Sequence, residues 1–196
     1  MLCIGHRGAK GHEPENTLCS IRRGLELGAE WIEVDVYAVE ERLIVMHVDT
    51  LDRTTNGRGP VEECTLEQLR SLDAGKGEKI PFLDEVFDLV DRRAGINVEL
   101  KGKNTAGLVA PFLRNRLSRG WTHDQLLVSS FNHRELAAFK ALAPEIPIGA
   151  LIVALPVDNA AFAGHLGAHS INPSVDHVDK ELVDDADRRG LKVFVF

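Results

Sequence analysis

Short apolar runs alternate with segments of helical periodicity from one end of the chain to the other. In the segment with Leu18, Ile21 and Leu25, apolar residues recur every three or four positions, and Gly28 marks the predicted end of that helix. Such alternation is typical of a parallel sheet covered by helices. The predicted strands are Leu2–His6, Trp31–Val36, Leu43–His47, Ile96–Lys101, Leu126–Phe131, Ile148–Ile152, His169–Asn172 and Lys192–Phe196.

The number of predicted strands favours a closed (β/α)8 TIM barrel over an open doubly wound sheet. The chain has 196 residues, fewer than the roughly 250 that are typical of such barrels. The last apolar run ends at Phe196, so the final helix is missing from the sequence, and we expect the chain to be part of a longer protein. We predict one barrel domain over residues 1–196, with an irregular insertion at about 49–81 after the third strand.

Polar residues share one face of three predicted strands, because the two-residue period of a strand separates them from the apolar residues. Helices on the outside of a barrel require the apolar face to point outward. The polar face must then point into the barrel mouth. The inward set is Glu33, Asp35, His47, Glu99 and Lys101.

Three of these residues, Glu33, Asp35 and Glu99, are carboxylates near the carboxyl ends of two strands. Carboxylate oxygens suit Mg²⁺, Ca²⁺ or Mn²⁺ better than zinc. The alternative is a buried ionic network in which the carboxylates pair with Arg7 and Lys101. Their position favours a metal site, because barrel enzymes place their active sites at this end of the strands.

Two histidines, His6 and His47, end the first and third predicted strands. A histidine in a core is often packed there without a chemical role. Two histidines at equivalent strand ends, beside three carboxylates, instead predict groups that transfer protons.

An ordered set of short motifs runs along nearly the whole chain. The motifs are His6-Arg7-Gly8, Pro-Glu-Asn-Thr at 14–17, Glu33-x-Asp35, His47, LDRTTNGRG at 51–59, Glu99-Leu-Lys101, Ser130-Phe131 and Asn172-Pro173. In this order they resemble the glycerophosphodiester phosphodiesterase family, in particular its short bacterial cytoplasmic type. The resemblance implies a (β/α)8 barrel, one divalent metal, and hydrolysis of a glycerophosphodiester to glycerol 3-phosphate and an alcohol.

The resemblance also implies a role for each matching residue. Magnesium is expected over calcium as the metal. Which histidine is the acid, and whether water or a substrate hydroxyl is the nucleophile, stay open. The implied metal ligands are Glu33, Asp35 and Glu99, the acid and base are His6 and His47, and the cations beside the phosphate are Arg7 and Lys101.

Three further positions bear on the site. Glu15 is expected to touch a metal-bound water or the glycerol hydroxyls. Asn16, or else Thr17, is expected to cap the helix that follows. Relatives usually have His-Asp at the end of the third strand, whereas here Val48 follows His47 and Asp49 comes one residue later. A hydrogen bond that this aspartate gives in relatives is therefore in question.

Composition excludes several other classes. A net charge of -7 without long basic clusters argues against nucleic-acid binding. No apolar run approaches the roughly 18 residues that span a bilayer, so we expect a cytoplasmic protein that acts on a small molecule without membrane insertion. Cys3, Cys19 and Cys64 are too widely spaced for a zinc knuckle, and their odd number argues against a disulfide framework. An oligomer, with a partner chain covering the last strand, is a further alternative.

Two other functions are compatible with the same residues. A phospholipase-type phosphodiesterase on this barrel would also use two histidines and a metal, but it needs an apolar rim that the polar insertion does not offer. A non-catalytic, anion-binding homologue would have lost a histidine or a ligand, whereas all of these residues are present.

Overall fold

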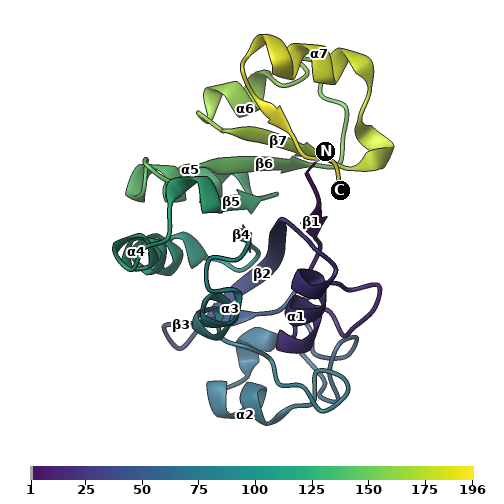
Figure 1. The fold of residues 1–196 in the computed structure, drawn as a ribbon, viewed down its shortest axis with the longest axis vertical. Helices are drawn as coiled ribbons and strands as arrows, with labels where there is room; N and C mark the ends of the chain where they lie inside the picture. The colour runs from purple at the N-terminus through teal and green to yellow at the C-terminus, as the bar shows by residue number, and fades with distance from the viewer. Residues whose placement is uncertain (1) are drawn as a thin grey trace.

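The computed structural model describes residues 2–196 as a curled parallel sheet with helices along its outer face (Figure 1). The sheet order is β1-β2-β4-β5-β6-β7-β8, and no pairing of β1 with β8 closes it within the described residues. The strands are β1 Ile4–Gly5, β2 Trp31–Val39, β3 Arg42–Val45, β4 Gly95–Leu100, β5 Leu126–Ser130, β6 Ile148–Ile152, β7 Ser170–Pro173 and β8 Lys192–Val193. The helices are α1 Leu18–Glu26, α2 Leu66–Ser71, α3 Leu83–Val90, α4 Thr105–Ser118, α5 His133–Leu142, α6 Ala161–His165 and α7 Lys180–Arg188.

The strand predicted at 43–47 differs from the others. β3 runs antiparallel to β2, with Val36 opposite Val45, and lies outside the parallel order. Glu40 and Glu41 connect the two strands and have φ values of 45° and 60°, as in a tight hairpin. A parallel crossover needs a dozen or more residues, so this short connection forces the antiparallel pairing. A (β/α)8 barrel implies eight parallel strands, and for β3 this prediction is wrong.

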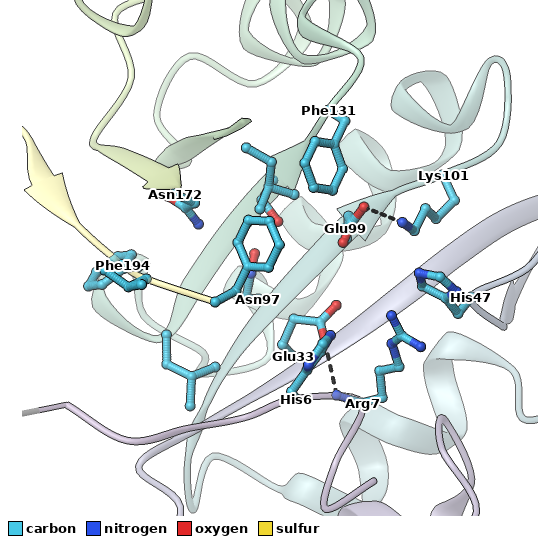
Figure 2. Close-up of a pocket in the computed structure, with 15 residues that line it drawn as sticks. His6, Arg7, Glu33, His47, Asn97, Glu99, Lys101, Phe131, Asn172 and Phe194 are labelled. Atoms are coloured by element: carbon cyan, nitrogen blue, oxygen red, sulfur yellow. Dashed lines mark hydrogen bonds and ion pairs between the residues drawn. The ribbon is translucent and has the colours of Figure 1, made fainter. Parts of the chain in front are cut away.

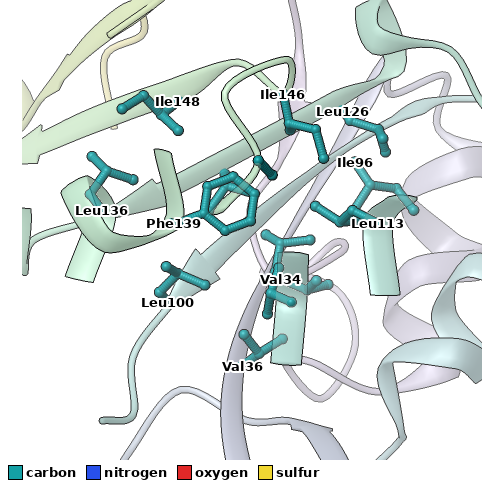
Figure 3. Close-up of a cluster of buried hydrophobic side chains, with 14 of the residues drawn as sticks. Val34, Val36, Ile96, Leu100, Leu113, Leu126, Leu136, Phe139, Ile146 and Ile148 are labelled. Atoms are coloured by element: carbon teal, nitrogen blue, oxygen red, sulfur yellow. The ribbon is translucent and has the colours of Figure 1, made fainter. Parts of the chain in front are cut away.

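The apolar faces of the strands point outward, as predicted. Ile32, Val34 and Val36 of β2 are fully buried in the main core. Figure 3 shows such strand side chains together with Leu113 of α4 and Phe139 of α5. Burying one large aliphatic side chain stabilises the fold by roughly 1.5–3 kcal/mol. This packing fixes the alternate residues of β2 on the inner face of the sheet.

The predicted insertion at 49–81 packs around a second, smaller core. Leu51, Val61 and Leu69 are buried there against Ile44 and Met46. Both faces of β3 are therefore covered, one by the main core and one by the insertion. This arrangement holds the insertion beside the carboxyl end of β2.

Side-chain caps begin three of the helices. Thr17 caps α1, as one of the two predicted candidates, and its side chain accepts a hydrogen bond from a backbone N–H of the first turn. Thr65 and Gln68 form a reciprocal capping box at α2. Asn132 accepts hydrogen bonds from two backbone N–H groups at the start of α5. Each of these helix starts is thus set by residues close together in the sequence.

Candidate active site

Three carboxylates converge at the carboxyl ends of β2 and β4. Glu33 and Asp35 lie on the inner face of β2, and Asp35 pairs in register with Glu99 of β4. All three are buried, and each offers an oxygen within 4.8 Å of the others. Figure 2 shows Glu33 and Glu99 facing the same pocket. The sequence thus identified three residues that the fold brings together.

Burial is the main cause that raises the pKa of each of these carboxyl groups. The charges of Asp35 and Glu99 raise the pKa of Glu33 further. Burial and the charge of Asp35 bring the pKa of Glu99 to about 7. Close carboxylates in a dry site favour protonation, and a bound divalent cation would favour the ionised forms instead.

Two cations partly neutralise the cluster. The Lys101 Nζ atom lies 2.7 Å from Glu99 Oε1 and 3.6 Å from Asp35 Oδ1. The Arg7 Nε atom lies 3.4 Å from Asp35 Oδ2, and the Arg7 backbone N–H donates a 2.9 Å hydrogen bond to Glu33. Part of the ionic network considered from the sequence is therefore present. Two cations against three carboxylates leave the cluster short of positive charge.

The free oxygens of the cluster suit a metal ion. Glu33 Oε1 and Asp35 Oδ1 are buried and accept no hydrogen bond from the described residues, while Glu99 Oε1 is paired with the Lys101 ammonium. A buried carboxylate oxygen without a donor is costly, so such atoms are usually satisfied by water or an ion. Three hard oxygen donors fit Mg²⁺ or Ca²⁺.

The turn after β1 brings His6 and Arg7 to the cluster. Gly8 follows them with a φ of +83°, and a Cβ atom there would lie 2.6 Å from the backbone of Ser20 in α1. Glycine is therefore required for this close approach. The His-Arg-Gly motif thus fixes the direction in which Arg7 enters the site.

Both predicted histidines line the same pocket (Figure 2). His6 Nε2 lies 3.8 Å from Glu33 Oε2. His47 lies beyond the end of β3, and its buried Nδ1 atom has no hydrogen-bond partner among residues 2–196. Burial, followed by nearby cations, lowers the pKa of each imidazole to about 4. Both rings are therefore neutral at pH 7 and able to accept a proton.

Glu15 contacts the site through Arg7. Its carboxylate accepts a 2.9 Å hydrogen bond from Arg7 and two, at 2.9 and 2.6 Å, from Arg53 of the insertion. Burial alone would raise the pKa of Glu15, but these hydrogen bonds and charges lower it to about 2. Glu15 therefore connects the insertion to a site cation.

Asn16 has a different role from the predicted helix cap. Its φ is 59°, and its Nδ2 group donates a 2.8 Å hydrogen bond to Asp35 Oδ2. The side-chain oxygen of Asn16 also accepts from the Asp35 backbone N–H at 3.3 Å. Asn16 orients a carboxylate of the site, while Thr17 caps the helix. The positive φ suits asparagine better than most residues.

Val48 stands after His47, where the family resemblance leads one to expect an aspartate. Val48 packs against the second core. The Asp49 backbone carbonyl accepts a hydrogen bond from Val61, and the Asp49 side chain makes no hydrogen bond with His47 among the described residues. The residue after His47 therefore anchors the insertion and does not orient the imidazole.

Sequence reasoning gave no role to three polar residues on the inner face, although Asn172 belongs to a matching motif. Asn97, Ser129 and Asn172 line the same pocket, from β4, β5 and β7. The two-residue period that identified Glu99 also places Asn97 on the inner face, but nothing local distinguishes a functional asparagine or serine from a packed one. Phe131, from the Ser130-Phe131 motif, lies with its ring centroid 5.4 Å from the Lys101 ammonium.

Replacing Arg53 by methionine is expected to raise KM for a phosphodiester roughly 2–10-fold with little change in kcat. Without Arg53, the carboxylate of Glu15 binds only Arg7, so it competes with the substrate phosphate for the Arg7 guanidinium. Steady-state kinetics measure this effect. Arg58→Met, an exposed change in the same insertion, is the control. Equal KM values for the two variants would show that the link from Arg53 to Arg7 has no influence on binding.

A curled parallel α/β sheet with carboxylates, imidazoles and cations at the carboxyl ends of its strands has the architecture of a barrel enzyme. The model of the glycerophosphoryl diester phosphodiesterase family matches residues 6–196. The chain therefore belongs to this family, and the enzyme class predicted from the sequence is confirmed.

Individual relatives support the same family assignment. The chain is 37% identical to the glycerophosphodiester phosphodiesterase of Caldanaerobacter subterraneus subsp. tengcongensis, over 98% of this chain and 84% of the relative. It is 34% identical to that of Bacillus altitudinis, over 97% of this chain and 84% of the relative. An Oleispira antarctica phosphodiesterase, solved with the product sn-glycerol-3-phosphate, is similar with a TM-score of 0.90 and 33% identity, over 100% of this chain and 84% of that structure. This similarity confirms the barrel fold class.

Within residues 2–196, no helix is both long and apolar enough to cross a bilayer.

Proposed function

We propose that this chain hydrolyses glycerophosphodiesters to glycerol 3-phosphate and an alcohol. The observation that carries the proposal is one pocket that holds three buried carboxylates, two neutral imidazoles and two cations. A phosphodiester is an anion whose charge grows in the transition state, so fixed positive groups stabilise that state more than the ground state. The similar Oleispira antarctica enzyme, solved with sn-glycerol-3-phosphate, supports the substrate class.

Each residue then has a role in the reaction. Arg7 and Lys101 bind the phosphate oxygens and orient the diester. One of His6 and His47 accepts a proton from the nucleophile, and the other donates a proton to the departing alkoxide oxygen. With water as the nucleophile this step gives glycerol 3-phosphate directly, and with a glycerol hydroxyl it gives a cyclic phosphate that water then opens. The bound phosphate anion raises the pKa of an adjacent imidazole, which generates the proton donor when substrate is present.

Glu33, Asp35 and Glu99 would hold one divalent cation, which supplies Lewis-acid stabilisation of the phosphate charge. Of the two candidates, we propose Mg²⁺ over Ca²⁺. Mg²⁺ usually binds through a few carboxylates together with water and substrate phosphate, and this site offers three carboxylates beside the phosphate position. Ca²⁺ is bound by six to eight oxygens, so it would need more additional ligands from water or phosphate than six-coordinate Mg²⁺ does.

The direct test is the release of sn-glycerol 3-phosphate from sn-glycero-3-phosphocholine. In Mg²⁺ we expect turnover that stops when excess chelator is added and returns when Mg²⁺ is restored. A parallel titration with Ca²⁺ compares the two ions. Product is measured with a coupled glycerol 3-phosphate dehydrogenase assay, added after the metal has been removed by chelation.

Two results would count against parts of the proposal. Hydrolysis that is unchanged by exhaustive chelation would reject the metal site but keep the substrate. Absence of product in either metal, with the protein folded by circular dichroism, would reject the substrate class itself.

A further inference from the structure

The inner faces of β4, β5 and β7 give the pocket a polar floor, which we define as Asn97, Ser129 and Asn172. Asn97 pairs in register with Glu33 and Ser129 with Glu99, whereas Asn172 lies farther along the sheet. Their exposed fractions are 5%, 0% and 4%. In Figure 2, Asn172 lies across the pocket from Lys101 and His47. The strand order explains this position, because β7 is four strands away from β2 along the curled sheet. None of these three residues has a role in the chemistry proposed above.

The polar floor offers hydrogen-bonding groups that the described residues leave free. Asn97 Oδ1 and Ser129 Oγ are buried and have no hydrogen-bond partner there. The Ser170 hydroxyl donates a 2.7 Å hydrogen bond to Asn172 Oδ1. With Oδ1 engaged in this bond, the Asn172 Nδ2 group is left as a donor. Buried polar groups without partners are rare in folded proteins, so their presence in a pocket indicates a polar ligand.

Gly149 makes room for this arrangement. A Cβ atom on Gly149 of β6 would lie 2.8 Å from Ser170 Oγ and 2.9 Å from Asn172 Oδ1. Any side chain at this position would push Asn172 and Ser170 out of place. Because Gly149 has no side chain, the Asn172 amide can lie directly against the backbone of β6 on the inner face.

We propose that the polar floor binds the hydroxyl groups of the glycerol moiety. This inference rests on the proposed function. With the phosphate at Arg7 and Lys101, one substituent of the diester extends toward the floor and the other toward the mouth. The floor is closed and offers both donors and acceptors, as a small polyol requires. The mouth includes Phe131, which is 40% exposed, and admits an alcohol group that varies between substrates.

The test compares two ligands that share a phosphate and a three-carbon chain. Binding of sn-glycerol 3-phosphate and of n-propyl phosphate to the Mg²⁺-loaded protein is measured by isothermal titration calorimetry. The wild type is expected to bind glycerol 3-phosphate at least about tenfold more tightly, because only this ligand completes the hydrogen bonds of the floor. Asn172→Ala should remove most of this preference while the affinity for n-propyl phosphate stays the same.

Two further variants keep the test decisive. Ser129→Ala removes only a hydroxyl oxygen without a partner, so it should fold normally and reduce the preference about threefold to tenfold. Asn115→Ala, the same change on the exposed face of α4, should leave both affinities unchanged. General damage to the pocket would weaken both ligands together, and that result would overturn the inference.

The remaining outcomes separate this inference from the proposed function. If the wild type hydrolyses sn-glycero-3-phosphocholine but binds both ligands equally, the glycerol does not contact the floor and the inference is wrong, while the function stands. The same conclusion follows if neither Asn172→Ala nor Ser129→Ala changes the preference. If the wild type hydrolyses no glycerophosphodiester, the function fails, and the inference fails with it.

Discussion

Replacing Glu33 by glutamine is expected to lower turnover in saturating Mg²⁺ on the order of 10²–10³-fold, because the site loses a charged ligand for the cation that stabilises the transition state. The same change should make the metal-free protein more stable at pH 8. Burial and the charges of Asp35 and Glu99 raise the pKa of Glu33, so its ionised form destabilises the fold. Loss of activity with a gain in stability would separate ligand removal from simple unfolding.

The pH dependence follows from the same shifts. The pKa of each of the three carboxyl groups is raised in the folded state, and that of Glu99 to about 7. Each therefore contributes stability at a pH below its unfolded value, and this stability is lost as the pH rises through the folded value. Without metal, the melting temperature of the wild type should fall, relative to Glu33→Gln, as the pH rises above the ordinary glutamate value of about 4.5. The histidines are the same in both proteins, so their effect cancels in the difference.

Thermal denaturation with chelator, and then with Mg²⁺, measures both effects. Mg²⁺ should raise the melting temperature of the wild type and have little effect on Glu33→Gln. Glu67→Gln, an exposed change on α2, is the matched control and should behave as the wild type. A Glu33→Gln protein that keeps full activity and the full Mg²⁺ response would remove Glu33 from the metal site.

Alanine at His6 or at His47 should lower kcat by about 10²–10⁴-fold while the rise in melting temperature with Mg²⁺ is kept, because neither imidazole is a metal ligand in the proposed site. Burial and nearby cations hold the pKa of each imidazole near 4. A group that accepts a proton must be neutral, so kcat/KM of the free enzyme should fall on the acid side near pH 4, well below the ordinary histidine value of about 6.5.

Full pH profiles of the wild type and both variants measure these effects. His165→Ala, an exposed change at the end of α6, is the control. An acid limb near pH 6.5 in the wild type would mean that the imidazole that acts as base is not buried in the free enzyme. Near-normal kcat in His47→Ala would exclude His47 from the chemistry, and its unpartnered Nδ1 atom would then need another explanation.

Short-range patterns in the sequence predicted most of the site. A strand alternates its side chains between two faces whatever its surroundings, so the spacing of Glu33, Asp35 and Glu99 was enough to place each on the inner face. The direct pairing of Asp35 with Glu99 depended on the tertiary structure, because β3 lies outside the parallel order and leaves β2 beside β4. The caps of α1 and α2 were equally readable, because each is formed within four residues. The strand ends, and then the family motifs, also indicated His6 and His47, which the pocket contains.

Direction and long-range contacts depended on the tertiary structure. The periodicity of residues 43–47 predicts a strand but not its direction, and the hairpin at Glu40 and Glu41 made it antiparallel. Asn16 looked like a cap, yet its amide hydrogen-bonds to Asp35, 19 residues away. A helix cap and a ligand-positioning amide have the same local sequence, so only the fold distinguishes them.

The sequence by itself determined the fold class, the acidic cluster and the two histidines, because each follows from local periodicity or from an ordered motif. Only the tertiary structure decided how Arg53 reaches Glu15, and how Asn97, Ser129 and Asn172 form one surface. These groups come from separate strands or from the insertion. Their distances are set by the curl of the sheet and by the packing of the second core, which no pattern within a single segment records.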